Sequence, residues 1–300
     1  MPADARAARS LLLRAPAFNA YLLALVDKGA LGHDEVAGPI VGYWRGGELE
    51  GICVLGSNLV ISEPVSEEAI ETFADYARRS RAAFWVAVGE DTTIDRFMNL
   101  YGRQARDIRV ERGGQVLFRM TESPQVPEAT EETGVVRPAE VEDLGVLLRT
   151  DRAMVSEELG FDPFESVARA YREGWLRRIR EGRCWVIGPT GGPLSFKMDQ
   201  SATSGDVVQL AGIYTAPSAR RRGLAVLGVT SVCATLLQSA EMVTLYVDSA
   251  NIPAVRLYEK CGKAAASESG RAPPNSVAGG CDYGLLSRLG TELPSALETL

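Results

Sequence analysis

Apolar positions early in the chain alternate between strand spacing and helix spacing. Two apolar stretches within residues 38–61 flank Gly46, which predicts a β-hairpin with its turn at this glycine. Ser66 and the two glutamates after it predict a helix start, because a serine hydroxyl caps a helix and acidic residues favour its first turn. Residues 83–88 then predict a buried strand, and residues 92–101 a second helix. Strands and helices therefore alternate in this region.

After residue 134 the pattern changes, and helical spacing comes before a run of strands. Apolar residues recur at helical spacing over 140–148, and residues 151–159 either continue that helix or begin a second one. The helical spacing recurs over 164–181. Short apolar stretches separated by glycine-rich turns then predict three strands, over residues 184–187, 193–198 and 207–214. The remaining predicted elements are a helix over 224–240, a strand over 243–247, a helix over 253–261 ending at Gly262, and a strand over 282–286.

The length of the chain favours two lobes. Three hundred residues exceed the about 100 to 200 residues that one domain usually holds. Residues 121–134 combine two prolines with acidic and hydroxyl residues and lack apolar periodicity, which is typical of a linker. We therefore expect an N-terminal lobe over residues 1–120 and a C-terminal lobe over residues 135–300.

Charge and cysteine usage exclude several classes of function. A net charge of −7 argues against a nucleic-acid partner, because such proteins need a basic surface, whereas it suits a cationic amine. The five cysteines are scattered, so neither a disulfide framework nor a zinc site is indicated, and a reducing cytoplasm fits best. The apolar patch over residues 20–26 is too short to span a membrane, so we expect neither secretion nor membrane insertion.

Residues 217–225 connect an apolar strand to an apolar helix, which is where an anion can meet unpaired helical N–H groups. Gly223 would allow the backbone to approach phosphate oxygens without a Cβ clash, and Ala225 keeps the start of the helix small. Three consecutive arginines before Gly223 add positive charge. This loop is therefore a candidate site for a ligand with several phosphates.

The same loop fits the Q/R-x-x-G-x-G/A pattern of the GNAT acetyltransferases, with Arg220, Gly223 and Ala225 in the specified places. A second segment, residues 245–262, resembles the N-x-x-A-x-x-L-Y-E-K-x-G motif of that family. The resemblance covers most of residues 135–262 and begins with a Val-Arg-Pro-Ala opening. Lys263 departs from it, because the family usually has an apolar residue there. The alternative is that the loop is a solvated helix start and the second segment only an amphipathic helix.

The resemblance implies an α/β (α+β) fold of two GNAT-like lobes, with mixed, mostly antiparallel sheets flanked by helices. It also implies an acetyl-CoA site and no metal. The strand before the loop would hold the pantetheine arm through its backbone. Asn251 would bind near this arm, although a turn or cap asparagine before Pro253 is the alternative. Tyr258 would lie beside the thioester and donate a proton to the leaving thiolate, although a packed tyrosine without a proton role is the alternative. The cofactor-binding residues implied are Leu210, Ala211, Gly212, Ile213, Tyr214, Arg220, Arg221, Arg222, Gly223, Leu224, Ala225, Asn251 and Tyr258.

The general base is left open. An amine is mostly protonated at neutral pH, so a group must accept its proton, directly or through water. Glu157 and Glu158 occur where GNAT proteins have their acceptor-site helices, and Asp199 ends a central strand. All three could equally be solvated surface acids. The only histidine, His33, lies far away in sequence, so a Ser-His-Asp hydrolase is poorly supported.

The N-terminal lobe carries a weaker GNAT likeness, over residues 44–60, and its counterpart of the phosphate loop has no glycine. By analogy we interpret it as a scaffold or as a wall of the acceptor site. The leading hypothesis is an acetyl-CoA-dependent N-acetyltransferase acting on an amine of a small molecule or a protein lysine. The alternative is a non-catalytic acyl-CoA-binding regulator. The sequence is compatible with a homodimer.

Overall fold

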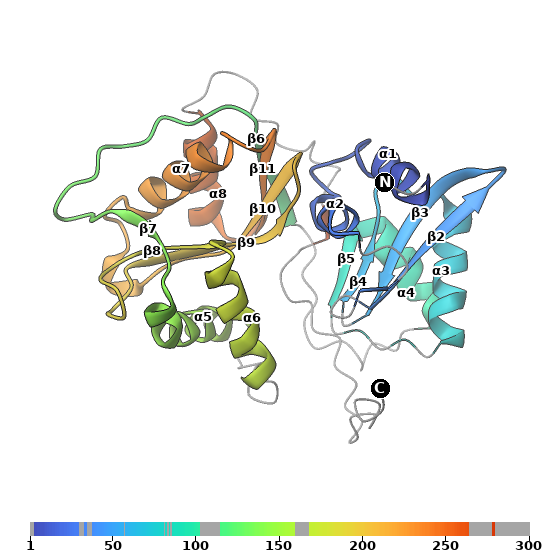
Figure 1. Cartoon of the computed structure of the whole chain (residues 1–300), viewed down its shortest axis with the longest axis horizontal. Coiled ribbons are helices and arrows are strands. Elements are labelled where there is room, and N and C mark those ends of the chain that lie inside the picture. The colour runs from blue at the N-terminus through green and yellow to red at the C-terminus, as the bar shows by residue number, and fades with distance from the viewer. Residues whose placement is uncertain are drawn as a thin grey trace.

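Two lobes, each built on a six-stranded sheet, make up the computed structural model (Figure 1). The structure describes residues 3–29, 33–34, 38–56, 58–80, 82, 84, 86–102, 115–159, 168–263 and 278–279. Each sheet is mixed and mostly antiparallel, with helices against its faces. The predicted fold class is therefore confirmed.

In the first lobe, alternate residues of one strand face different helices. Ile52 and Val54 of this strand pack with the first two helices, whereas Cys53 and Leu55 pack with the next two. This is the period of two that a strand buried on both faces requires. The elements of this lobe are α1 (Ala3–Leu12), α2 (Ala20–Asp27), β1 (His33–Asp34), β2 (Gly38–Arg45), β3 (Glu48–Leu55), β4 (Asn58–Ile61), α3 (Glu67–Arg79), β5 (Val86–Glu90) and α4 (Asp91–Tyr101).

The predicted hairpin and helix start of this lobe are both confirmed. Strands β2 and β3 pair antiparallel from Arg45 and Glu48 outward, around the turn that contains Gly46. The Ser66 hydroxyl accepts a hydrogen bond from the Ala69 N–H at 3.3 Å and so caps α3. The apolar patch over residues 20–26 forms most of α2, and its side chains are largely buried.

The second lobe follows the predicted order of helices and strands, with β9 and β10 in the middle of its sheet. Helices α5 and α6 cover one face of the sheet and α7 and α8 the other (Figure 1). The elements are β6 (Gln115–Met120), β7 (Val136–Pro138), α5 (Leu144–Leu159), α6 (Ala168–Arg180), β8 (Cys184–Ile187), β9 (Phe196–Thr203), β10 (Val207–Thr215), α7 (Leu224–Leu236), β11 (Met242–Asp248) and α8 (Ile252–Lys263).

Some boundaries differ from those predicted. Residues 140–159 form a short 3-10 turn followed by the single helix α5. Helix α8 continues through Gly262 to Lys263, so Gly262 does not end it as predicted. The predicted strand over residues 282–286 lies outside the described residues. In the described part of the chain, none of the helices combines the length and the apolar character needed to cross a membrane.

Both sheets have the same pairing pattern. In the first sheet, each neighbouring pair from β1 to β4 is antiparallel and β4 pairs parallel with β5. In the second sheet, β7 to β10 pair antiparallel and β10 pairs parallel with β11. The two lobes therefore repeat one architecture.

Each sheet is completed by a strand from elsewhere in the chain. Strand β6 precedes residues 121–134 but pairs antiparallel with β11, from Gln115 opposite Asp248 to Met120 opposite Val243. Strand β12 (Ala278–Gly279) pairs with β5 of the first sheet. The sequence-predicted first lobe extended to residue 120, whereas the strand at its end belongs to the second sheet, because it fills the open edge of β11.

The lobes pack through α1 and α2. Helix α2 contacts β9 and β10, and Val207 at the start of β10 joins the apolar cluster of α1, α2 and β3. Arg9 of α1 forms an ion pair with Asp206, which immediately precedes β10. The first lobe thus meets the second sheet at the end where β10 and β11 begin.

Candidate active site

Strands β10 and β11 separate halfway along their length. Their parallel ladder runs from Val207 opposite Met242 to Leu210 opposite Leu245 and then stops. Both strands continue, to Thr215 and Asp248 respectively. Residues 211–215 change from buried to half-buried at the same point. Backbone groups that leave a ladder need other partners, so this opening can receive an extended polar ligand.

An irregularity in β10 lies at the start of the opening. Ala211 is opposite Asp199 and Tyr214 is opposite Lys197, so residues 212 and 213 together face a single residue of β9. Gly212 has a φ of 58°, in the left-handed region that favours glycine. Such a bulge bends the strand and redirects its backbone groups. The predicted pantetheine strand, residues 210–214, therefore contains the opening and the bulge.

The loop after β10 leads into a helix start without a side-chain cap. Gly223 is the N-cap of α7, with a φ of 80° and no side chain to accept hydrogen bonds. The first backbone bond of the helix goes from the Leu227 N–H to the Gly223 carbonyl at 3.0 Å. The N–H groups of the first turn, which include those of Leu224 and Ala225, lie at the positive end of the helix dipole. This is the local geometry that binds phosphate.

The arginines of this loop have defined contacts. The guanidinium group of Arg220 lies 3.1 Å from both carboxylate oxygens of Glu157 and donates to the Thr215 carbonyl. It also lies over the ring of Tyr214, whose hydroxyl is 3.1 Å from Glu157. Burial, followed by the hydrogen bond to Glu157, raises the pKa of Tyr214. The structure therefore brings together Glu157 of α5 and the predicted cofactor loop.

Arg222 donates a hydrogen bond of 2.7 Å to the carbonyl of Glu132, in the segment predicted as the linker, which in the structure joins β6 to β7 of the second sheet. Residues 121–135 form neither helix nor strand, and they run past α7 from one edge of the second sheet to the other (Figure 1). Arg221 has a φ of 65°, a second left-handed residue just before Gly223. The loop thus contains two left-handed residues, Arg221 and Gly223, before the helix begins.

The second motif segment forms the end of β11 and helix α8. The Asn251 side chain accepts a hydrogen bond from the Ala254 N–H at 3.2 Å, so it caps α8. Tyr258 is buried on α8, and its ring lies 5.5 Å from that of Phe118 on β6. The strand that comes from before the linker thus packs directly against the predicted proton donor.

The predicted bases lie in different surroundings. Glu157 is exposed and engaged by Arg220. Glu158 is the next residue of the same helix, and its side chain lies outside the described part of the structure. Asp199 is only 6% exposed, on the face of β9 that α5 and α6 cover. Burial raises the pKa of Asp199, and the nearby Arg178 and Lys197 oppose that rise.

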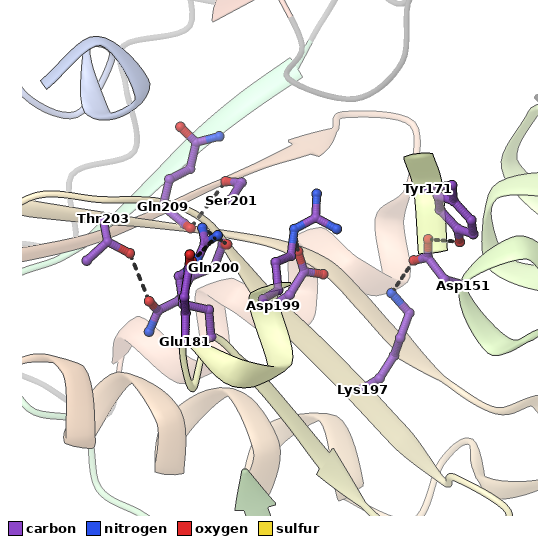
Figure 2. Close-up of polar contacts among 11 residues, drawn as sticks. Asp151, Tyr171, Glu181, Lys197, Asp199, Gln200, Ser201, Thr203 and Gln209 are labelled. Carbon is purple, nitrogen blue, oxygen red and sulfur yellow. Dashed lines mark hydrogen bonds and ion pairs between the residues drawn. The ribbon is translucent and has the colours of Figure 1, made fainter. Parts of the chain in front are cut away.

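A charged cluster that the sequence did not reveal lies under α5 and α6. Lys197 of β9 is fully buried, and its Nζ lies 2.5 Å from an Asp151 carboxylate oxygen. The Tyr171 hydroxyl donates to the other oxygen of Asp151 at 2.5 Å. Figure 2 shows these three side chains converging, with Asp199 two residues further along β9. In the described residues, no three His, Cys, Asp or Glu side chains are gathered in a way that could hold a metal ion.

Comparisons with known proteins find a family match within each lobe. Residues 152–263 match the model of the acetyltransferase (GNAT) family. Residues 38–145 match a domain of unknown function, DUF4081. No curated protein matches the sequence.

Solved structures share the fold of nearly the whole chain. A Drosophila protein has a TM-score of 0.56 at 15% identity, over 87% of this chain and 93% of its own. A tandem GNAT protein from the clavulanic acid biosynthesis pathway has a TM-score of 0.52 at 13% identity, over 86% and 90%. A GCN5-related N-acetyltransferase from Kribbella flavida is 18% identical over 87% and 91%, with a TM-score of 0.48. Residues 152–263 therefore match a GNAT acetyltransferase domain, and nearly the whole chain shares its fold with a tandem GNAT protein.

Proposed function

We propose that this protein is an acetyl-CoA-dependent N-acetyltransferase that transfers an acetyl group to an amine of a small molecule or a protein lysine. One observation carries the proposal: β10 separates from β11 just before an uncapped helix whose N-cap, Gly223, is left-handed. An extended arm that ends in a pyrophosphate matches this sequence of backbone features. Acetyl-CoA has both.

Each group of residues would then have its own role in binding or catalysis. The first-turn N–H groups of α7 would bind the pyrophosphate, and the loop arginines would add charge. The freed backbone of residues 211–214 would hold the pantetheine arm, which positions the thioester. Tyr258 would protonate the departing thiolate, and Asn251 would lie beside the arm while it caps α8. The contact of Arg220 with Glu157 keeps this arginine at the mouth of the loop.

The first lobe would act as a scaffold without a cofactor of its own. Its helices α1 and α2 meet the second sheet where β10 and β11 begin, at the opposite end from their separation. The helix that corresponds to α7 by position after the parallel strand is α3, which is capped by Ser66 and has Glu67 and Glu68 in its first turn. A capped, acidic helix start repels a polyphosphate.

A thiol-release assay with acetyl-CoA and a panel of primary amines tests the function. We expect CoA release that depends on the acceptor and acetylated amine as the second product. The panel should contain small diamines, amino acids and lysine peptides, so that the size limit of the acceptor is measured together with activity. Binding of acetyl-CoA without acceptor-dependent release from any of them would refute catalysis and favour an acyl-CoA-binding regulator.

A further inference from the structure

Strand β9 carries two charged residues where the fold offers an apolar environment. Phe196 and Met198 point to the core under α7, and Lys197 and Asp199 point to the opposite face. That face is covered by α5 and α6, so Lys197 is fully buried and Asp199 is 6% exposed. A strand covered on both faces is normally apolar, because burying a charge costs several kcal/mol unless it is well paired.

Lys197 is well paired. Its ammonium group contacts Asp151 of α5 and lies 5.1 Å from the ring centroid of Trp175 on α6. Asp151 is held in turn by Tyr171. These contacts join α5, α6 and β9 into one fixed network, which gives a structural reason for the lysine.

Asp199 lacks this support. Within the described residues its closest cation is Arg178, at 3.9 Å, and its carboxylate makes no hydrogen bond there. The indole N–H of Trp175, in the same cluster, is buried without a hydrogen-bond partner in the described part of the chain. Buried polar groups almost always have partners, so the unpaired Trp175 N–H and the weakly paired Asp199 carboxylate leave hydrogen-bonding capacity unused between the helices and the sheet.

The carboxylate of Asp199 lies directly against the bulge of β10. A Cβ built on Gly212 would be 2.3 Å from Asp199 Oδ1 and 2.8 Å from Lys197 Nζ. Only a glycine leaves room for these two groups at this position, and Gly212 lies two residues beyond Leu210, where pairing with β11 stops. Asp199 therefore lies at the place where the opening starts, on the face opposite α7.

We propose that Asp199 is the catalytic base, which accepts a proton from the acceptor amine at the bulge, while the Lys197, Asp151 and Tyr171 network positions it. This proposal rests on the proposed N-acetyltransferase function. It assigns the acceptor site to the α5 and α6 face of the sheet, and it requires an acceptor that arrives as a primary ammonium ion. The ammonium ion supplies the missing hydrogen-bond partner of the carboxylate.

The acceptor nitrogen loses two protons in the proposed reaction. The ammonium ion gives one proton to the Asp199 carboxylate and becomes the neutral amine, whose lone pair attacks the thioester carbonyl carbon. The carbon–sulfur bond breaks as the amide forms, and the sulfur takes the electron pair. The second proton of the nitrogen replaces the one that Tyr258 gives to the thiolate. Asp199 then releases its proton to solvent, so the turnover yields the amide, CoA thiol and one proton.

Glu157 fits this role less well than Asp199. It is exposed, and both of its oxygens are already engaged by Arg220. Its contacts lie with the phosphate loop and the Tyr214 hydroxyl, whereas Asp199 lies against the bulge itself. A base that is partly shielded from water and lacks a hydrogen-bond partner is better placed to bind the ammonium group.

The test compares Asp199→Asn with wild type and with the control Asp206→Asn, which removes a carboxylate at the far end of the sheet. For Asp199→Asn we expect a kcat at least about 100-fold lower, in line with the usual contribution of a general base. Its acetyl-CoA Kd should stay within about twofold, and its Tm should not fall, because a buried charge is removed. The remaining activity should rise with pH in proportion to the free amine. The control should match the wild type in kcat.

Three results would overturn the assignment. A kcat of Asp199→Asn within about fivefold of wild type would exclude proton transfer to this residue. A large fall in Tm or in acetyl-CoA affinity would show a structural role. If the variant does not fold, carbon-13 titration of the wild-type aspartate carboxyls decides, because a pKa of Asp199 at or below the ordinary range would refute the shielded base. Failure of the proposed function can be distinguished from failure of the Asp199 assignment, because the wild type itself would then release no thiol with any amine.

Discussion

Replacing Gly223 with valine should separate binding of acetyl-CoA from stability. At a φ of 80°, a non-glycine residue is strained by about 1–2 kcal/mol, and a β-branched one by more. A Cβ at this position meets no atom within 4 Å, so the protein itself leaves room for the side chain. The variant should therefore fold, with either a strained turn or a shifted one.

The bound pyrophosphate makes the difference. If the turn shifts, at least one N–H group in the first turn of α7 no longer points at a phosphate oxygen. If the turn keeps its conformation, the valine side chain crowds the bound ligand. A hydrogen bond to a charged group contributes about 1.5–3 kcal/mol, which corresponds to a loss of affinity of roughly 10- to 150-fold. Titration calorimetry with acetyl-CoA measures this directly.

Gly182 provides the matched control. It has a φ of 67°, and a Cβ on it also meets no atom within 4 Å, but it lies in the turn between α6 and β8. Gly182→Val should lose a similar amount of stability and keep the affinity for acetyl-CoA. Equal affinity in a folded Gly223→Val variant would refute the phosphate site, and equal losses in the two variants would show that strain alone is responsible.

Further predictions concern the proton donor, the number of sites, the thiols and the pH dependence. Tyr258→Phe should lower kcat more than it changes the acetyl-CoA Kd in calorimetry, because only the proton donor is lost. Calorimetry should also give one acetyl-CoA per chain, and Gly223→Val should show no second site. Burial raises the pKa of Cys53 well above its usual range, that of Cys184 and Cys233 to about 12, and that of Cys261 to about 11. A Cys281→Ser chain should therefore react with a thiol reagent only after unfolding. Because burial raises the pKa of Asp199, its ionisation costs stability above that pKa, so Asp199→Asn should gain more stability over wild type at pH 7 than at pH 4, measured by urea unfolding.

The geometry of the proposed phosphate loop could be predicted because it depends on neighbouring residues in the sequence. A glycine before an apolar helix places the N-cap and the free N–H groups next to each other in sequence, and Gly223 is indeed a left-handed N-cap. The helix start at Ser66 was predictable for the same reason. The separation of β10 from β11 was expected only from the family resemblance, since the apolar pattern of both strands continues past the point where pairing stops.

The charged cluster could not be predicted, because its sequence pattern is also typical of a strand with one solvent-exposed face. Phe196, Lys197, Met198 and Asp199 alternate apolar with charged residues, as in a strand with one face in water. Helices α5 and α6 cover that face, and their own contribution, Asp151, lies far away in sequence. The exchange of β6 into the second sheet was hidden for a similar reason, since pairing between distant segments leaves no periodic signal.

The two lobes share one architecture but differ at the helix start where we propose the cofactor site of the second lobe. Both have a parallel pair of strands beside three antiparallel pairings, and in both a helix follows the fourth strand of the sheet order. In the second lobe, that helix begins at a glycine, and three arginines precede it. In the first lobe, it begins at Ser66, whose hydroxyl already binds the Ala69 N–H, and two glutamates follow. The sheet therefore supplies only the position, whereas the four or five residues at the start of the helix decide whether an anion can bind there.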